Sequence, residues 1–262
     1  FYLQILKFKT YQTRADSNRI KSFVVPPLRG IIKDRSDHII ANNISHYRIL
    51  YDPEGNLGID LLIEKIAKIL SLKKESFYYV HEKYQRRSSD GFLLIHDNLN
   101  WEQIAKIEVN APDLPGVIVD IAQRRYYPYS FYLAPMIGFV ARVDEKDLET
   151  NNKLLSHPDF KIGKTGIEQV FENYLRGTAG LKHVEVDAYG YTVRTLNLLS
   201  SKPATSGLNL DLSIDIELQK QAYDLLKDKS GSVVLLDVET GEVLSMCSTP
   251  SFDPNPMVVG IE

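Results

Sequence analysis

The stretch "GKTGIEQVFENYLRGTAG" (163–180) combines glycine-rich turns with a regular apolar stripe. Gly163 and Gly166 come before the stripe, where glycine permits tight turns. Gly177 follows it and can end a helix. The apolar residues recur at helical spacing: Ile167, Val170, Phe171, Tyr174 and Leu175. The pattern predicts one amphipathic helix over residues 167–175.

The same stretch contains Lys164-Thr165-Gly166, a triplet shared by enzymes that react with penicillin. That chemistry also needs a serine nucleophile with a lysine one helical turn later, and a facing Ser-x-Asn. Ser-x-x-Lys occurs once, at Ser71 and Lys74, in a context typical of a helix end, and Ser-x-Asn does not occur. The triplet is therefore predicted to form a turn rather than an active site, and the chain is predicted to lack the nucleophile.

Composition narrows the class of protein. The 262 residues are 44% hydrophobic and 25% charged, which is typical of globular chains and long enough for two domains. A net charge of −3, with no long basic run and only pairs at Arg86-Arg87 and Arg124-Arg125, argues against nucleic-acid binding. Cys247 is the single cysteine and is predicted to be a small buried residue. Six scattered histidines give no metal motif, and no cofactor is expected.

Three helices have clear signals. Residues 59–70, "IDLLIEKIAKIL", carry an apolar stripe on one face. Asn100 and Gln103 have the spacing of a capping box at the start of the next helix. Asp215 is the expected N-cap of a helix in "DIELQKQAYDLLKDK". The charged and aromatic residues 73–87 predict a further, exposed helix.

Strands are predicted between these helices. Residues 24–43 read as extended segments joined by a turn at 34–37. Residues 116–128 follow a Pro-Gly turn as a strand, and residues 183–196 form a hairpin turning near Gly190. The near-continuous apolar residues 231–251 predict a buried hairpin. The chain is therefore assigned to the α+β class.

The segment "NLLSSKPATSG" (197–207) is the best candidate for a linker. It divides the chain into a first domain of residues 1–200 and a second of residues 201–262. An apolar hairpin normally belongs to a larger sheet, so the second domain is expected to be incomplete.

Several blocks together resemble the class B penicillin-binding proteins. They are "PPLRGIIKDR" (26–35), "RRYYPY" (124–129), the stretch 163–180, "VEVDAYG" (184–190) and "LDLSIDIELQKQA" (210–222), in the family's order. "NLNWEQIAKIEVN" (98–110) is most similar to the cell-elongation type, and the division type is the near alternative. The residues that match the family's motifs are Arg29, Gly30, Asp34, Arg35, Tyr127, Pro128, Gly163, Gly166, Glu168, Gly177 and Gly190.

The resemblance implies a periplasmic pedestal domain followed by an incomplete transpeptidase domain. It implies a membrane anchor upstream of residue 1, at the periplasmic face of the bacterial inner membrane. The whole protein would cross-link peptidoglycan stem peptides during cell elongation and bind β-lactams. The implied partners are an MreC-like scaffold and a RodA-like glycan polymerase. Rival interpretations are a non-enzymatic periplasmic adaptor and an enzyme that uses Ser71 or Lys164.

Two sets of residues carry more specific expectations. Arg29, Asp34 and Arg35 are expected to form one salt-bridge cluster. Tyr78, Tyr79 and Tyr84 lie in a charged segment and are the candidates for partner binding, because interface cores favour tyrosine. The aromatic run at 126–132 is expected to be half core, with a partner surface as the alternative.

Overall fold

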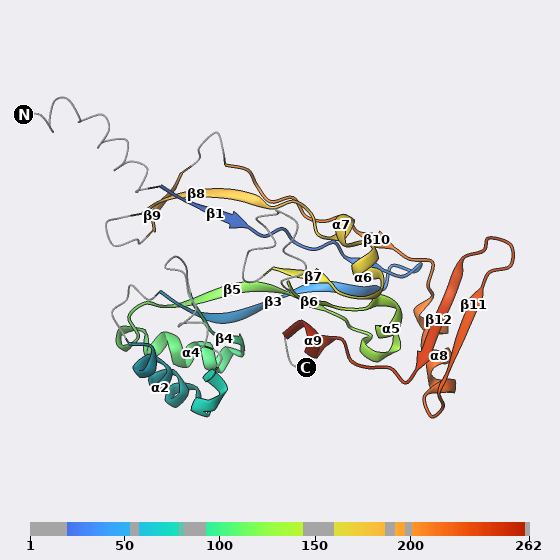
Figure 1. Cartoon of the computed structure of the whole chain (residues 1–262), viewed down its shortest axis with the longest axis horizontal. Helices are drawn as coiled ribbons and strands as arrows, with labels where there is room; N and C mark the ends of the chain where they lie inside the picture. The colour runs from blue at the N-terminus through green and yellow to red at the C-terminus, as the bar shows by residue number, and fades with distance from the viewer. Residues whose placement is uncertain are drawn as a thin grey trace, which may run out of the picture. The chain divides into compact units, whose positions relative to one another are not determined.

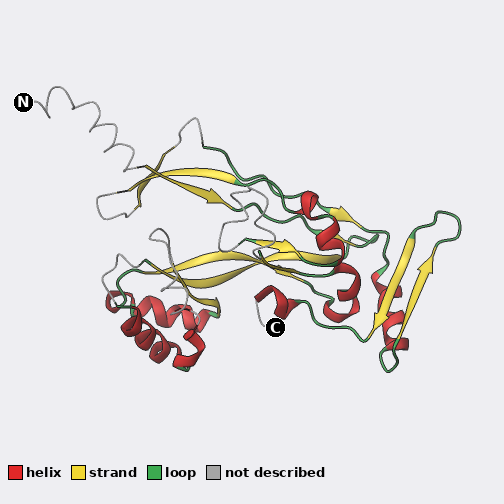
Figure 2. Ribbon diagram, in the orientation of Figure 1, coloured by secondary structure: helices red, strands yellow, loops and turns green. Residues whose placement is uncertain are grey.

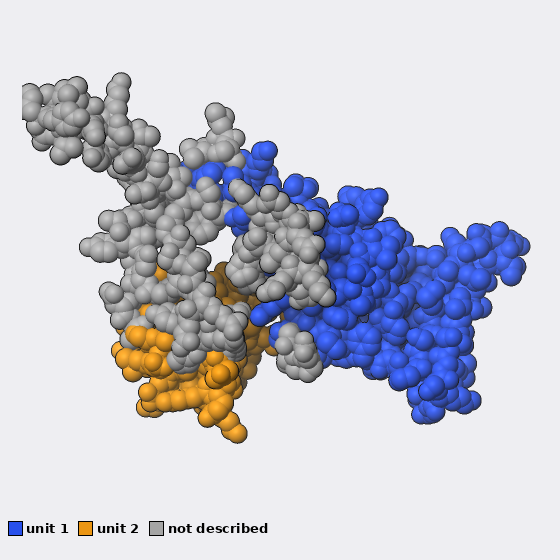
Figure 3. Space-filling model, viewed as in Figure 1, with its two compact units in different colours: residues 1–43, 125–262 blue, residues 44–124 orange. Residues whose placement is uncertain are grey.

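The computed structural model describes residues 20–52, 58–78, 80, 93–143, 160–186, 192–196 and 201–259. They form two compact units, residues 1–43 with 125–262 and residues 44–124 (Figure 3). The boundary predicted at residue 200 falls inside the first unit, so the compact units do not follow it. The predicted division into two domains therefore stays a prediction.

The second unit packs two helices, α2 (Ile59–Leu70) and α4 (Trp101–Val109), on one side of its strands (Figures 1 and 2). The strands are the latter part of β3 (Ile39–Tyr51), β4 (Leu93–Leu99) and most of β5 (Val117–Tyr126). Two 3-10 turns, η3 (Lys74–Phe77) and η4 (Ala111–Asp113), follow the helices. Leu62, Ile66 and Ile95 are fully buried in the shared core.

The helix starts of the second unit confirm the sequence signals. The Asn100 side chain accepts a bond from the Gln103 N–H at 2.8 Å, and the Gln103 side chain accepts one from the Asn100 N–H at 2.9 Å. These reciprocal bonds satisfy backbone donors that a helix start leaves unpaired. Leu99 and Ile104, which flank the capping box at the spacing of an apolar staple, lie in the same buried cluster.

Besides the hairpin at residues 231–249, the first unit contains three small strand groups. β1 (Ile20–Val25), β8 (Gly180–Val186) and β9 (Thr192–Leu196) form an antiparallel sheet with β8 in the centre. β2 (Ile32–Lys33) pairs with the start of β3 and, in parallel, with β10 (Leu210–Asp211). β6 (Val140–Arg142) pairs with β7 (Lys161–Gly163). The predicted 183–196 hairpin is confirmed, although its turn at Gly190 lies outside the described residues.

The helix predicted over 167–175 is wrong. Two short helices, α6 (Gly166–Val170) and α7 (Glu172–Leu175), are separated at Phe171. Leu175 is fully buried as expected, but Val170 is 75% and Tyr174 61% exposed. The residue buried in their place is Glu168, which is 0% exposed. The side of α6 that faces inward therefore carries a charged residue.

The described part of the predicted linker is held by backbone bonds to the first unit. Thr178 and Thr205 pair as an isolated bridge, and the Leu208 N–H donates to the Tyr174 carbonyl at 2.9 Å. A Cβ atom at Gly207 would lie 1.8 Å from the Leu175 carbonyl oxygen, so only glycine fits this crossing. Residues 201–207 are therefore a fixed part of the unit, not a flexible linker.

The C-terminal part has α8 (Ile216–Leu226), the hairpin β11 (Gly231–Leu236) and β12 (Val243–Thr249), and α9 (Asn255–Val259). Asp215 caps α8 as predicted, at 3.0 Å from the Glu217 N–H. The hairpin is confirmed, but the prediction that it is buried is wrong for β11, which is exposed throughout. The helix α8 packs mainly against β12, where Cys247 is buried as expected.

None of the helices in the described part of the chain combines the length and apolarity that a membrane span requires.

Candidate functional site

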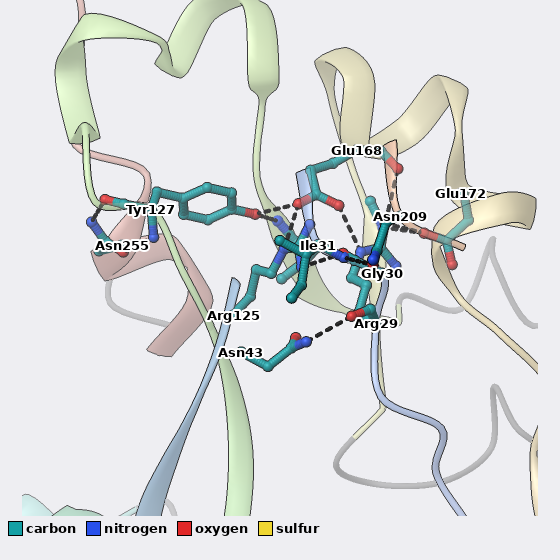
Figure 4. A network of polar contacts seen from close by, with 12 residues as sticks. Arg29, Gly30, Ile31, Asn43, Arg125, Tyr127, Glu168, Glu172, Asn209 and Asn255 are labelled. Carbon is teal, nitrogen blue, oxygen red and sulfur yellow. Dashed lines mark hydrogen bonds and ion pairs between the residues drawn. The ribbon is translucent and has the colours of Figure 1, made fainter. Parts of the chain in front are cut away.

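The carboxylate of Glu168 is the centre of a buried charged network in the first unit (Figure 4). Arg29 Nε lies 2.6 Å from Glu168 Oε2, and Arg125 Nε lies 2.7 Å from Glu168 Oε1. The Tyr127 hydroxyl donates a third bond to Oε1 at 3.2 Å. Several strong donors therefore replace the water that an ionised carboxylate would lose on burial.

The two arginines also bind the backbone and a second carboxylate. Arg29 Nη2 lies 3.0 Å from the Glu168 carbonyl oxygen and 2.7 Å from Glu172 Oε2. Arg125 Nη1 donates to the Gly30 carbonyl at 2.7 Å. Burial alone would lower the pKa of Arg29, but the charges of Glu168 and Glu172 outweigh it and raise that pKa. Two guanidinium groups thus face two carboxylates, and their formal charges cancel.

Tyr127 extends the network to two further segments. Its hydroxyl accepts a bond from the Val140 N–H at 3.1 Å. The Asn255 side chain accepts a bond from the Tyr127 N–H at 3.0 Å and donates one to the Tyr127 carbonyl at 3.1 Å. Burial and the nearby charge of Glu168 raise the pKa of Tyr127, so the phenol stays neutral. A neutral phenol that donates to a carboxylate and accepts from the backbone acts as a structural connector.

The network joins segments that are distant in the sequence. Arg29 and Glu168 are 139 residues apart, and Arg125 and Glu168 are 43 apart. The backbone amide of Gly163 adds a bond to Glu172 Oε2 at 2.9 Å. Each charged side chain here has an ion-pair partner, so the arrangement fixes chain crossings. Two buried atoms of the network, Arg125 Nη2 and Glu172 Oε1, have no hydrogen-bond partner within the described residues.

The expected cluster of Arg29, Asp34 and Arg35 is not formed. Asp34 accepts bonds from the Ser36 and His38 N–H groups, both at 2.8 Å, because it occupies the turn between β2 and β3. Burial alone would raise the pKa of Asp34, but the hydrogen bond with the His38 ring at 3.0 Å and the bonds from the backbone N–H groups of His38, Ser36 and Ile216 outweigh it and hold the pKa below its usual value. Arg35 lies near Glu242, at 3.6 Å on the surface.

The motif glycines have backbone roles. Gly166 has φ of +60°, and a Cβ atom there would lie 2.4 Å from the Met136 carbonyl oxygen. A Cβ atom added at Gly163 would lie 2.0 Å from the Glu168 carbonyl oxygen, and Gly177 has φ of +74°. Pro128 is exposed in the turn after β5. The three glycine positions require close backbone approach or left-handed geometry, which glycine allows.

The triplet Lys164-Thr165-Gly166 lies in the tight turn between β7 and α6. The Lys164 N–H donates to the Phe139 carbonyl at 2.9 Å. The other candidate pair is also engaged in local structure, since Ser71 ends α2 in a left-handed conformation and Lys74 pairs with Glu64 at 3.3 Å. Neither place has the arrangement of an acylating serine.

The candidates for partner binding are only partly described. Tyr78 is 77% exposed, and Tyr79 and Tyr84 lie outside the described residues. Within the aromatic run, Tyr127 is buried, while Phe131 and Tyr132 stack against Tyr223 of α8 with ring centroids 5.2 Å apart. Much of this run therefore packs against the chain's own helix.

Sequence reasoning missed Arg125, Glu172, Asn43 and Asn255. A signal existed for Arg125, because Arg125 and Tyr127 are two residues apart at the end of a strand and so point to the same face. No local pattern marks Asn43, whose side chain donates to the Arg29 carbonyl at 2.6 Å. In the part of the chain that the structure describes, no group of three or more potential ligands could hold a metal ion.

The family profile described as the Penicillin-binding Protein dimerisation domain matches residues 24–212. The chain belongs to the penicillin-binding proteins. This penicillin-binding protein chain is 35% identical over 265 residues to the peptidoglycan D,D-transpeptidase MrdA of Haemophilus influenzae, covering 100% of this chain and 40% of the relative. It is 36% identical to MrdA of Escherichia coli K12, with 100% and 41% covered. The chain thus spans about two fifths of these curated relatives' length.

Solved structures of penicillin-binding proteins agree with this assignment. A complex between penicillin-binding protein 2 and MreC from Helicobacter pylori matches with a TM-score of 0.74 at 26% identity, covering 91% of this chain and 44% of that one. A peptidoglycan synthase complex matches with a TM-score of 0.64 at 25% identity, covering 98% and 44%. The α+β pedestal fold and the resemblance to penicillin-binding protein 2 are therefore confirmed.

Proposed function

We propose that this chain is the pedestal and the start of the catalytic domain of a cell-elongation peptidoglycan D,D-transpeptidase. The whole protein would cross-link stem peptides and bind penicillin, and this part would supply positioning and partner binding. The observation that carries the proposal is 35–36% identity to the D,D-transpeptidases MrdA over the full length of the chain. In this proposal the nucleophile belongs to the part of the relatives that this chain does not match.

A positioning role fits the chemistry of the described residues. The Glu168 network holds Arg29, Arg125 and Tyr127 in fixed, inaccessible pairs. Such groups hold backbone segments together and carry out no reaction. The triplet at 164–166 and Ser71 have turn and helix-end geometry, so the pedestal would act through its shape and its surface.

The proposed partners are an MreC-like scaffold and a RodA-like glycan polymerase. The support is that similar solved structures include penicillin-binding protein 2 with MreC, and a complex that couples polymerization to crosslinking. The proposed location is the periplasmic face of the inner membrane, with an anchor upstream of residue 1. Tyr78, which is 77% exposed, is the described candidate for the MreC contact, together with Tyr79 and Tyr84.

Calorimetric titration of the 262-residue chain with the periplasmic region of MreC from the same organism tests the proposal. We expect a complex, and about tenfold or greater weakening when Tyr78, Tyr79 and Tyr84 are all replaced by alanine, since interface tyrosines often contribute above 1 kcal/mol. Tyr174→Ala, at a 61% exposed tyrosine of the other unit, is the matched control. Absence of a complex at high micromolar concentrations counts against the scaffold partner.

Fluorescent-penicillin labelling separates the rival enzyme from the proposal. We expect no covalent label on the chain alone. Stoichiometric label that disappears in Ser71→Ala would show a self-sufficient enzyme instead. The division-type alternative predicts that MreC fails to bind while a division scaffold binds.

A further inference from the structure

Gln219 of α8 uses the complete hydrogen-bonding capacity of its amide. Nε2 donates to the Tyr132 and Met246 carbonyl oxygens, both at 2.8 Å. Oε1 accepts from the Ser245 hydroxyl and the Met246 N–H, both at 2.9 Å. The side chain is 0% exposed. Among uncharged side chains only an amide supplies two donors and a doubly accepting oxygen, so this site is specific for its residue type.

These bonds connect three separate elements of the first unit. They join α8 to β12 and to η5 (Ser130–Tyr132), which follows the pedestal strand β5. Aromatic contacts join the same two elements, because Tyr223 of α8 packs on Phe131 and Tyr132, and Lys220 Nζ lies 4.9 Å above the Tyr129 ring. Apolar packing favours contact without fixing direction, whereas hydrogen bonds require defined angles. The amide therefore sets how the hairpin is oriented on the 129–133 loop.

A second attachment holds the start of the same helix. Asp34 Oδ2 accepts a bond from the Ile216 N–H at 3.3 Å, and the Arg35 N–H donates to the Ile214 carbonyl at 3.0 Å. The turn between β2 and β3 thus contacts the N-terminal end of α8. Two attachments along one helix prevent it from pivoting about either of them.

We propose that Gln219 is a positioning residue that fixes the hairpin β11–β12 to the 129–133 loop of the first unit, so that these two parts of the unit move as one rigid body. This inference rests on the proposed function, in which the hairpin belongs to the first part of the catalytic domain. Residues 201–212 are bonded to the unit rather than free, so they do not act as a pivot. A movement that a partner imposes on this part of the pedestal would then reach the catalytic domain directly.

Distance measurement between two spin labels in the 262-residue chain tests the inference. Val238, beyond β11 and 98% exposed, and Val170, 75% exposed, are suitable positions in the same unit. We expect one narrow distance distribution for the labelled parent chain and a broadened or shifted one for Gln219→Leu. Gln221→Leu is the matched control, because Gln221 is an exposed glutamine of the same helix, and it should keep the narrow distribution.

Hydrogen exchange gives an independent measure in the same variants. The Met246 amide donates to Gln219, so its exchange should become about tenfold faster in Gln219→Leu, the effect of losing one net hydrogen bond. Amides of α2 in the second unit should be unchanged. An unaltered distance distribution in a folded Gln219→Leu chain would overturn the proposal.

Gln219→Glu keeps the proposal testable if the leucine variant does not fold. An ionised carboxylate would face two carbonyl oxygens, so burial should raise its pKa above about 4.3, the usual value for glutamic acid. The protonated acid can still donate one bond, so the distribution should narrow again as pH falls through the raised pKa. The ionisable side chains Lys220, Tyr132 and Tyr223 lie on the elements that contact Gln219, and the hydrogen bond to Glu217 raises the pKa of Lys220. A distribution that is broad and independent of pH would contradict a hydrogen-bonding role.

The outcomes separate this inference from the proposed function. The distance and exchange measurements need no partner and no activity. Failure to bind MreC would remove the proposed partner and leave a rigid joint intact. A mobile joint in the parent chain would refute the positioning role of Gln219 and leave the MreC result unaffected.

Discussion

Glu168 and strand β11 belong to the same compact unit and have opposite environments. Glu168 carries a charge and is 0% exposed, whereas the apolar residues Val234 and Leu236 of β11 are 54% and 53% exposed. A ranking by hydrophobicity alone would place them the other way round. Glu168 is buried because two arginines and a tyrosine complete its hydrogen bonds. β11 is exposed because α8 packs mainly on β12.

The difference shows what burial depends on in this chain. A charge is buried where distant segments supply matching donors, and an apolar strand stays exposed where no second layer covers it. Both conditions are properties of tertiary structure. The following predictions test each side of the comparison, beginning with the charged region.

The largest effect is expected from removing the charge of Glu168. Glu168→Gln keeps the shape of the side chain but leaves Arg29 and Arg125 without their shared carboxylate. Breaking one partner out of a buried ion pair typically costs about 3–5 kcal/mol, because a charge is left buried and uncompensated. Urea titration of the chain should show a correspondingly lower midpoint.

The matched control for this variant is Glu217→Gln. Glu217 pairs with Lys220 at 2.8 Å on the surface of α8, where its side chain is 65% exposed. Exposed pairs contribute about 0–1 kcal/mol, so its midpoint should barely move. Equal shifts for the two variants would mean that the Glu168 network is no stronger than a surface pair.

A smaller effect is expected for Phe171→Ala. The sequence pattern placed Phe171 on the apolar face of a helix, and loss of the ring would cost about 3–5 kcal/mol if it were fully buried. The ring is only partly buried against the core, so about 1.5–3 kcal/mol is expected. Lys164→Ala, in the turn just before α6, should cost about 0–1 kcal/mol. Urea titration compares the two, and equal midpoint shifts would indicate a role of the triplet beyond its turn.

Local sequence predicted the parts of the fold that depend on near neighbours. The capping box at Asn100 and Gln103 spans three residues, and the Asp215 cap spans two. Such signals are complete within one helical turn. The relation of Arg29 to Glu168 spans 139 residues, so no local pattern contained it. The same limit explains the mistaken helix at 167–175, where an inward-facing glutamate outweighed the apolar stripe.

The expected grouping of Arg29, Asp34 and Arg35 failed for a related reason. Three charged residues close in sequence suggested one cluster, but a turn directs them to different partners. Asp34 bonds the turn's own backbone, and Arg35 faces Glu242. Family resemblance identified Arg29, Tyr127 and Glu168 but not Arg125 or Glu172, and the way these residues pair required the tertiary structure.

The pH dependence of stability tests Asp34. Hydrogen bonds hold its pKa below the usual value despite burial. A depressed folded-state pKa contributes stability above the unfolded-state value of about 3.9, and this is lost as pH falls through the folded-state pKa. Urea titrations of the parent chain and Asp34→Asn should therefore differ at pH 7 and converge in acid. A difference that stays constant from pH 7 to pH 3 would show that ionisation of Asp34 is irrelevant.

The smallest effect is expected in β11, on the exposed side of the comparison. Val234→Thr replaces one methyl group by a hydroxyl on a residue that is 54% exposed, so the free energy of unfolding should change by about 0.5 kcal/mol or less. The comparison change on β12 is Cys247→Thr, which places a hydroxyl and an added methyl group where exposure is 2% and should cost about 1–3 kcal/mol. Thermal unfolding of both variants makes the test direct. If Val234→Thr were as destabilising as Cys247→Thr, β11 would be covered in solution, and the contrast with Glu168 would no longer hold.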